Sequence, residues 1–156
     1  MRFCFLALFF SYFFITIWVT TSAQTLVPKN IGAVTPLAWG DYDNDGWPDL
    51  FVVTYQAQND MLYHNDGNGT FNRIFNTLPA MDGDWGSACA WGDYDNDGKL
   101  DLYVTASNSI SRLYHNDGNG VFSISGTLPS FEQGYSFMAN WGDFDNDGWL
   151  DLFVPK

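Results

Sequence analysis

The chain has few basic residues and little cysteine, and both shortages limit what it can do. Only six residues are Lys or Arg, against eighteen Asp or Glu, and the formal net charge is −12. Because so few cations cannot displace counterions from phosphates, we expect no nucleic-acid partner. Cys4 lies in an apolar N-terminal run, which leaves Cys89 alone in the rest of the chain and excludes an internal disulfide there. The apolar surroundings of Cys89 predict a small core residue rather than a reactive thiol.

Helical signals and catalytic motifs are also missing after the N-terminal run. No later segment has helical periodicity or a capping box. No nucleophile elbow, HExxH motif or phosphate-binding loop appears either. The two histidines, His64 and His115, occupy equivalent positions of a repeat, which favours a scaffold role over catalysis. We therefore expect an all-β protein that is not an enzyme.

The N-terminal residues have the pattern of an export signal. Met1-Arg2 precedes the apolar run Phe3–Val19, and small residues then lead to Ala23. This order is typical of a secretory signal peptide, here residues 1–23, cut after Ala23. An uncleaved anchor is the alternative, because the run approaches the length of a membrane span. We expect cleavage, a secreted or cell-surface protein, and no membrane span in the mature chain.

The mature chain is a tandem repeat. The segment Trp39–Gly46 recurs identically at Trp91–Gly98, and with one change at Trp141–Gly148. A second segment, Leu62–Gly69, recurs identically at Leu113–Gly120. A Thr-Leu pair begins each copy. Residues 24–156 therefore divide into three units, which are 25–76, 77–126 and 127–156.

Each complete unit contains four short segments with the composition of β-strands. In the first unit they are residues 37–39, 50–55, 61–64 and 71–75, rich in apolar, β-branched and aromatic residues. The Asn-Asp-Gly-Asn-Gly segment at 65–69 suits a hairpin turn, because Asn and Gly accept positive φ. Four antiparallel strands per repeat of this length predict the blade of a β-propeller, with a solenoid or sandwich as weaker alternatives.

The third unit supplies only the first half of such a blade. The chain would then hold an incomplete ring of about 2.5 blades, which leaves sheet edges uncovered. We expect a fragment of a larger propeller. A self-assembling oligomer of partial rings is the alternative.

The acidic residues are concentrated in three loops of the form D-x-D-N-D-G-x-x-D. Twelve of the eighteen carboxylates lie in these loops, at 41–49, 93–101 and 143–151. Carboxylates at loop positions 1, 3, 5 and 9, with a main-chain carbonyl at position 7, offer the hard oxygen ligands that Ca²⁺ prefers. Position 7 varies between Trp and Lys, as expected where only the main chain is a ligand. The sequence therefore predicts up to three Ca²⁺ sites.

Three other interpretations of these loops fit less well. An EF-hand begins in the same way but needs a bidentate Glu at position 12. That position is Val52, Val104 or Val154 here, and strand-like residues follow, which excludes an EF-hand. Mg²⁺ retains its own waters and rarely accepts a cage made only of protein ligands. Purely solvated acidic turns would carry the repulsion of four clustered carboxylates with nothing to offset it.

The segments WGDYDNDGWPDLFV and LYHNDGNGTF resemble the FG-GAP/VCBS repeat family, which includes the propellers of integrin α subunits. The resemblance covers nearly all of the mature chain. It implies that each acidic loop joins the first two strands of a blade and holds one Ca²⁺. The ligands it implies are Asp41, Asp43, Asp45, Asp49 and the carbonyl of Trp47; Asp93, Asp95, Asp97, Asp101 and the carbonyl of Lys99; and Asp143, Asp145, Asp147, Asp151 and the carbonyl of Trp149.

We expect calcium to be structural, since repulsion between clustered carboxylates opposes folding until a cation neutralises them. The expected function is that of a secreted calcium-binding propeller module for extracellular binding or adhesion, with a protein or glycan ligand. The alternative is the propeller part of an extracellular enzyme, of the polysaccharide lyase or phospholipase type, whose catalytic residues lie elsewhere.

Overall fold

A computed structural model describes most of the chain. The described ranges are 36–54, 58–81, 86–107, 110–125 and 137–155. All of them belong to one compact part of the chain, Thr35–Lys156. The predicted signal peptide and the start of the first unit lie outside these ranges, so the domain boundaries remain predictions. Within the described ranges, no helix has both the length and the apolar character needed to span a membrane.

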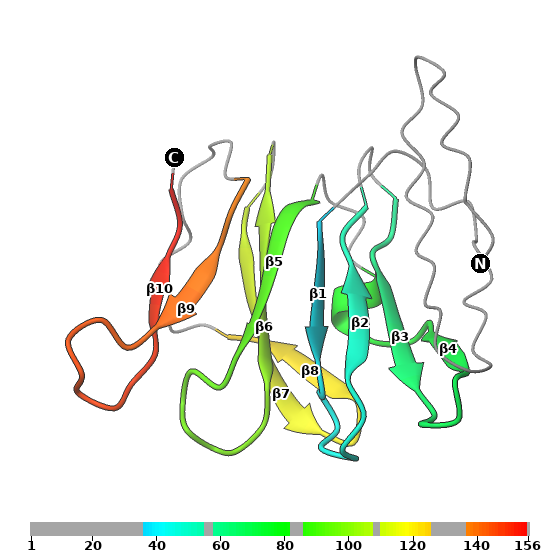
Figure 1. The fold of residues 1–156 in the computed structure, drawn as a ribbon. Coiled ribbons are helices and arrows are strands. Elements are labelled where there is room, and N and C mark those ends of the chain that lie inside the picture. Colours follow the sequence, from blue (N-terminus) through cyan, green and yellow to red (C-terminus); the bar gives the residue numbers. More distant parts are fainter. Residues whose placement is uncertain (1–35, 55–57, 82–85, 108–109, 126–136, 156) are drawn as a thin grey trace, which may run out of the picture. The chain divides into compact units, whose positions relative to one another are not determined.

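The first unit folds into a four-stranded antiparallel sheet (Figure 1). Its strands are β1 (Leu37–Gly40), β2 (Asp49–Val52), β3 (Met61–Asn65) and β4 (Phe71–Ile74). They lie side by side in chain order, the arrangement of consecutive hairpins. Gly40 pairs with Asp49, so the first acidic loop joins the adjacent ends of β1 and β2.

The second unit repeats this sheet, and the third supplies two paired strands. The strands are β5 (Gly86–Gly92), β6 (Asp101–Ala106), β7 (Arg112–Gly118), β8 (Val121–Ile124), β9 (Asn140–Gly142) and β10 (Asp151–Phe153). Gly92 pairs with Asp101, and Gly142 pairs with Asp151, so every acidic loop occupies the same place in its unit. The prediction of an all-β fold built from four-stranded antiparallel repeats is confirmed.

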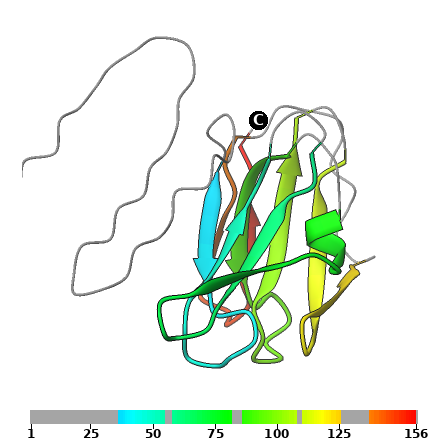
Figure 2. The same ribbon diagram turned by 90° about the vertical axis from the view of Figure 1, so that its right-hand side faces the viewer.

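One short helix, α1 (Leu78–Met81), was not predicted. It begins just after Thr77, whose carbonyl accepts the N–H of Ala80 at 3.1 Å. Pro79 lies in its first turn, where the missing N–H costs nothing. A single turn is too short to show apolar periodicity, which is why the sequence did not reveal it. Figure 2 shows this green helix beside the yellow strands of the second sheet, and it contacts both β3 and β8.

The hydrophobic core lies between neighbouring sheets. The larger cluster combines side chains of the first unit, α1 and the second sheet: Tyr42, Phe51, Val53, Leu62, Ala80, Leu102, Val104, Tyr114 and Phe122. The smaller cluster joins the second sheet to the third unit through Tyr103, Leu113 and Ala139. Cys89 packs against the larger cluster, and burial raises the pKa of its thiol to about 12, as expected for a core residue. Each sheet therefore depends on its neighbour for much of its apolar burial.

The tryptophans of the second and third WGD motifs each fasten a unit to the preceding one. The indole N–H of Trp91 donates to the carbonyl of Ala38 at 3.3 Å, and its ring lies over Gly40. A Cβ at Gly40 would lie 2.7 Å from the Trp91 ring, so only glycine leaves room for the indole. Trp141 makes the same contacts with the second unit, through the carbonyl of Ala90 and the backbone of Gly92.

Replacing Gly40 by valine is expected to destabilise the protein by about 1–3 kcal/mol, because the added side chain forces the indole of Trp91 out of its slot. Thermal unfolding of the purified variant measures this loss. The matched control is Gly142→Val, since a Cβ at Gly142 meets no atom of the described residues within 4 Å. Equal melting temperatures for the two variants would contradict this account of the slot.

Candidate metal centres

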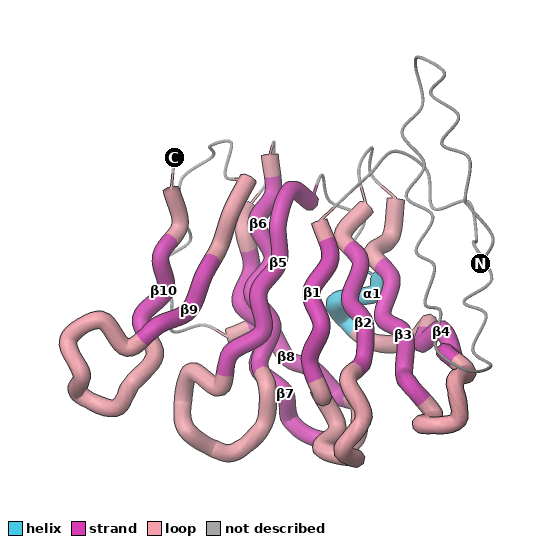
Figure 3. Tube along the Cα trace, in the orientation of Figure 1, coloured by secondary structure: helices cyan, strands magenta, loops and turns pink. Residues whose placement is uncertain are grey.

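The three acidic loops lie at the same end of their sheets (Figure 3). Each leaves the last residue of one strand and ends on the aspartate that begins the next, at Asp49, Asp101 or Asp151. Asparagine at position 4 and glycine at position 6 have positive φ in all three loops, for example 59° at Asn44 and 92° at Gly46. These residue types accept that conformation readily, and they fold the loop back on itself.

The aspartate at position 1 organises the loop. In the first loop, Asp41 accepts the N–H of Asp45 at 3.0 Å and the N–H of Gly46 at 2.9 Å. Asp45 in turn accepts the N–H of Trp47 at 2.8 Å. The second and third loops repeat all three bonds to within 0.1 Å. The three predicted sites therefore share one local geometry, set by the loop's own side chains.

This geometry brings together three of the four predicted ligand carboxylates of each loop, those at positions 1, 3 and 5 in the first loop and those at positions 1, 3 and 9 in the other two. Oxygens of Asp41, Asp43 and Asp45 lie within 4.8 Å of one another. In the second and third loops the carboxylates at positions 1, 3 and 9 form the corresponding sets: Asp93, Asp95 and Asp101, and Asp143, Asp145 and Asp151. These spacings fit the oxygen shell of a single divalent cation, whose ligands lie about 2.3–2.6 Å from Ca²⁺.

The aspartate at position 9 lies deeper than the others and connects two parts of the unit. Asp49 is fully buried, and its two oxygens accept the N–H of Tyr42 at 3.1 Å and the N–H of Asn65 at 2.8 Å. Asp101 is equally buried and bonds in the same way to Tyr94 and Asn116. Each of these carboxylates therefore ties its acidic loop to the third strand of the same sheet.

Burial works against the charge of these two carboxylates. It raises the pKa of Asp49 to about 6, because desolvation outweighs the backbone hydrogen bonds from Asn65 and Tyr42 that favour the charged form. The pKa of Asp101 is raised for the same reason. A cation beside either carboxylate would oppose this shift, since it would stabilise the charged form.

Each histidine lies over the acidic loop of its own unit. The sequence predicted only a scaffold role for them, from their equivalent positions in the repeat. His64 Nδ1 is 3.1 Å from Asp43 Oδ2 and 3.3 Å from Asp49 Oδ1. His115 Nδ1 is 3.1 Å from Asp101 Oδ1 and 3.5 Å from Asp95 Oδ2. The signal that could have located them is their place in the repeat, directly before the Asn whose N–H reaches position 9.

The side chains at position 7 have contacts of their own. The Trp47 indole lies against the hairpin glycine Gly67, where a Cβ would be 2.3 Å from its Nε1. Lys99 forms an ion pair with Asp97, which lowers the pKa of that carboxyl. Trp47 and Lys99 therefore use their side chains differently, while the main-chain N–H of both residues donates to position 5.

Neighbouring loops are joined directly. The side-chain amide of Asn44 donates to the carbonyl of Gly98 in the next loop at 2.8 Å. Asn96 makes the same bond to Gly148 at 3.0 Å. Position 4 of one loop therefore holds position 6 of the following loop.

Replacing Asn44 by glycine is expected to cost about 0.5–1 kcal/mol of folding stability, since it removes the bond to Gly98 but keeps a residue that accepts positive φ. Asn146→Gly is the control, because Asn146 has the same backbone conformation, with φ 62°, at the corresponding position of the third loop. Thermal unfolding of the two variants isolates the inter-loop bond. Equal losses would show that only the backbone change matters.

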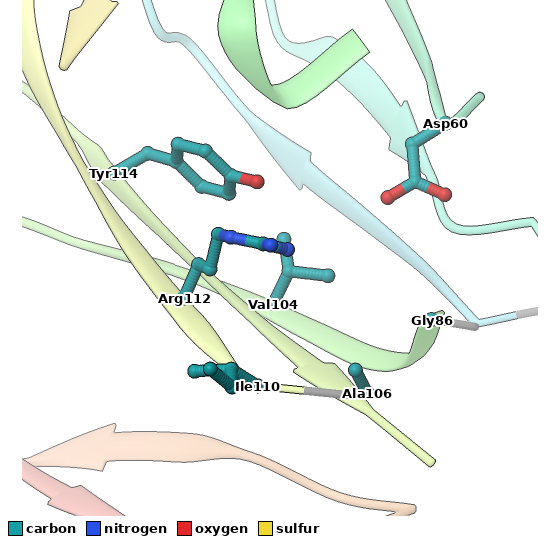
Figure 4. A pocket seen from close by; sticks show the side chains of 7 residues that line it. All are labelled: Asp60, Gly86, Val104, Ala106, Ile110, Arg112 and Tyr114. Atoms are coloured by element: carbon teal, nitrogen blue, oxygen red, sulfur yellow. The ribbon is translucent and has the colours of Figure 1, made fainter. Parts of the chain in front are cut away.

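One hollow outside the loops carries opposite charges. It is lined by Asp60, Gly86, Val104, Ala106, Ile110, Arg112 and Tyr114. Figure 4 shows Tyr114, Arg112 and Ile110 along one side and Asp60 on the other. Asp60 is buried and accepts the N–H of Thr54 at 2.7 Å, so its carboxylate holds the connection between β2 and β3.

Comparison with known protein families agrees with this architecture. The family model described as FG-GAP-like repeat matches the chain twice, over residues 41–104 and 97–154. Each match begins within one acidic loop and extends through the next, so the matches follow the repeat seen in the structure. A search of curated proteins finds no match to the chain.

Proposed function

The chain belongs to the FG-GAP-like repeat family, and from this membership we propose that it is a calcium-stabilised propeller-type module with an extracellular binding role. The observation that carries the proposal is the convergence of carboxylate oxygens in three loops of the same geometry. Each loop collects four formal negative charges in nine residues. Such a loop is most stable with a divalent cation among its oxygens.

The donor set favours calcium over other metals. All the predicted ligand atoms are oxygens, from the four aspartates and the position 7 carbonyl of each loop, and hard cations prefer oxygen. The position 1 carboxylate of the first loop accepts two backbone N–H groups, so hydrogen bonds within the loop hold this carboxylate in place. Calcium accepts the irregular geometry of such a loop more readily than Mg²⁺ does.

In this proposal calcium holds the fold together and does not act in a reaction. Position 9 links each site of the first two units to its sheet, and position 4 links each of these sites to the next. When bound, the ion would neutralise repulsion within a loop and so stabilise both sets of contacts. We propose that the module acts in binding or adhesion to a protein or glycan, and we propose no catalytic activity.

An extracellular location is part of the proposal and is supported by the N-terminal residues and by the calcium affinity that we expect. Residues 1–23 have the composition of a signal peptide. Extracellular calcium modules typically bind with dissociation constants of about 10⁻⁴–10⁻³ M, which suits the calcium concentration outside cells and not that of the cytosol.

Isothermal titration calorimetry of the metal-free chain with CaCl₂ tests the proposal. We expect up to three calcium ions per chain, with dissociation constants of about 10⁻⁴–10⁻³ M. The variant Asp143→Asn/Asp145→Asn should lose one ion and retain the others, because it removes the charge of two predicted ligands from the third loop alone. MgCl₂ serves as the control cation. No heat of binding with calcium, or equal heats with both cations, would refute calcium as the natural ligand.

A further inference from the structure

The contacts that join one unit to the next occur twice in the chain, and together they define an inter-unit contact. Its first part is the indole of Trp91 or Trp141, which fills a glycine slot and donates to the carbonyl just before the WG pair of the preceding unit. Its second part is the hydrogen bond that the side-chain amide at position 4 of one loop donates to the carbonyl at position 6 of the next. The preceding unit supplies the slot, and the following unit supplies the tryptophan.

Aromatic side chains of the preceding unit are covered by this contact. Phe51 is fully buried and lies edge-on to Trp91 with ring centroids 6.2 Å apart. Tyr103 is 1% exposed and lies edge-on to Trp141 at 6.5 Å. Tyr42, at loop position 2, is 5% exposed and packs against Trp91 and Phe122.

Among the described residues, the third unit presents the same receiving surface with no other unit packed on it. We call this surface the trailing face; it comprises Asn140, Gly142, Phe144, Asn146 and Phe153. Phe153 corresponds to Phe51 but is 67% exposed, and Phe144 corresponds to Tyr42 but is 83% exposed. In the part of the chain that the structure describes, the slot at Gly142 contains no atom within 4 Å of an added Cβ, whereas Gly40 and Gly92 are each covered by an indole.

The first unit presents the matching donor surface, the leading face, which comprises Trp39, Gly46, Asn65 and Phe71. Trp39 is 46% exposed and packs against Phe71 with centroids 5.9 Å apart, as Trp91 packs against Phe122 at 6.2 Å. Asn65 donates to the carbonyl of Pro48 at 2.9 Å.

The equivalent of Asn65 in the second unit makes one more bond, and this bond crosses between units. Asn116 donates to the carbonyl of Leu100 at 3.0 Å and also to the carbonyl of Tyr42 in the first unit at 2.7 Å. An amide nitrogen has two hydrogens to donate, so Asn65 has the same capacity. The leading face therefore carries the full set of donors that the second unit uses to hold the first.

We propose that the trailing face of one copy of this chain docks on the leading face of a second copy. In that contact Trp39 fills the slot at Gly142 and donates to the carbonyl of Asn140. Asn146 donates to the carbonyl of Gly46, and Asn65 donates to the carbonyl of Phe144. Phe144 and Phe153 become buried. Every one of these contacts reproduces a contact that the chain already makes twice, or once in the case of Asn65, between its own units.

Another WGD unit supplies the tryptophan, the acidic loop and the hairpin asparagine that this contact needs, and the occupant that we propose is such a unit in a second copy of the chain. The two faces differ, so the association is head to tail, and each added copy leaves one face of each kind at the ends until a ring closes. The acidic loops 41–49 and 143–151 lie next to each other in this contact. Association should therefore be stronger when calcium neutralises the loops, a dependence that rests on the proposed function.

Sedimentation velocity of the full chain, at about 1–100 μM protein with calcium, tests the proposal, since micromolar dissociation corresponds to an interface of modest strength. We expect the mean mass to rise with concentration. Gly142→Val should remain monomeric with an unchanged melting temperature, because the slot is open in the single chain. Phe144→Ser changes the same trailing face and should also remain monomeric. Val121 is an exposed apolar residue that belongs to neither face, so the Val121→Ser variant should associate as the original chain does.

A mixing experiment tests the head-to-tail geometry. Gly142→Val keeps an intact leading face, and Trp39→Ala keeps an intact trailing face. Each variant alone should be monomeric, and an equimolar mixture should form one-to-one heterodimers. A monomeric original chain, self-association of Gly142→Val at the original strength, or a mixture that stays monomeric would each overturn the proposal.

Repeating sedimentation in EDTA with about 1 M NaCl separates this proposal from the proposed function, because salt at that concentration screens the repulsion between loops beyond about 3 Å. Association under these conditions would support the docking contact even if calcium did not bind. A chain that stays monomeric both in calcium and in EDTA with NaCl would overturn the docking contact and leave the proposed calcium sites standing.

Discussion

Removal of calcium with EDTA is expected to lower the melting temperature of the chain by about 10–20 °C relative to about 1 mM calcium. With a dissociation constant of about 10⁻⁴ M, each site would contribute about 1.4 kcal/mol at that concentration, and three sites about 4 kcal/mol. The physical reason is the repulsion within each loop, which an ion removes only in the folded chain. Circular dichroism melting curves in calcium and in excess EDTA measure the shift.

Two controls make this result specific. Magnesium in place of calcium should restore little of the lost stability, because Mg²⁺ retains its waters. The combined variant Asp43→Asn/Asp95→Asn/Asp145→Asn changes position 3 in every loop and should melt at nearly the same temperature in calcium and in EDTA. Superimposable melting curves for the unaltered chain would show that calcium does not stabilise it.

Asp101→Asn is expected to destabilise the protein by about 2–4 kcal/mol both with and without calcium. Asp101 is fully buried, and its two oxygens accept the N–H groups of Tyr94 and Asn116. An asparagine retains only one acceptor oxygen there, so its amide group would face a backbone donor. Chemical denaturation in both buffers measures the loss.

Asp95→Asn is the matched variant within the same loop. Asp95 occupies position 3, is only partly buried, and keeps an acceptor oxygen for the N–H of Asp97 after the change to Asn. We expect its cost to appear with calcium and to vanish in EDTA. If Asp101→Asn also lost its effect in EDTA, position 9 would be a metal ligand only and not a structural tie.

These two aspartates show how far prediction from the sequence extended. The repeated DxDNDG pattern identified the loops, and the structure places them where the resemblance implied, between the first two strands of each unit. The sequence pattern could not distinguish position 9 from position 3, since both are aspartates in every copy. The distinction arises from the third strand, whose N–H at Asn65 or Asn116 reaches position 9 from at least fifteen residues away in the chain.

Local chemistry explains what the sequence determined by itself. Asn and Gly at fixed places set the loop turns, segments rich in apolar, β-branched and aromatic residues set the strands, and the repeat set the number of sheets. Each of these depends on neighbours along the chain, so each copy of the motif gives the same element. The one-turn helix α1 escaped prediction because so short an element leaves no periodic signal.

Only the tertiary structure decided which copies of a residue are buried. Tyr42 and Phe144 occupy the same motif position, yet they are 5% and 83% exposed. Gly40 and Gly142 occupy the same position as well, and an indole covers only the first. The physical reason is that burial depends on the unit that packs against a residue, and the local sequence is the same with or without that unit. The sequence specified identical sites, and the packing of one sheet on the next made them different.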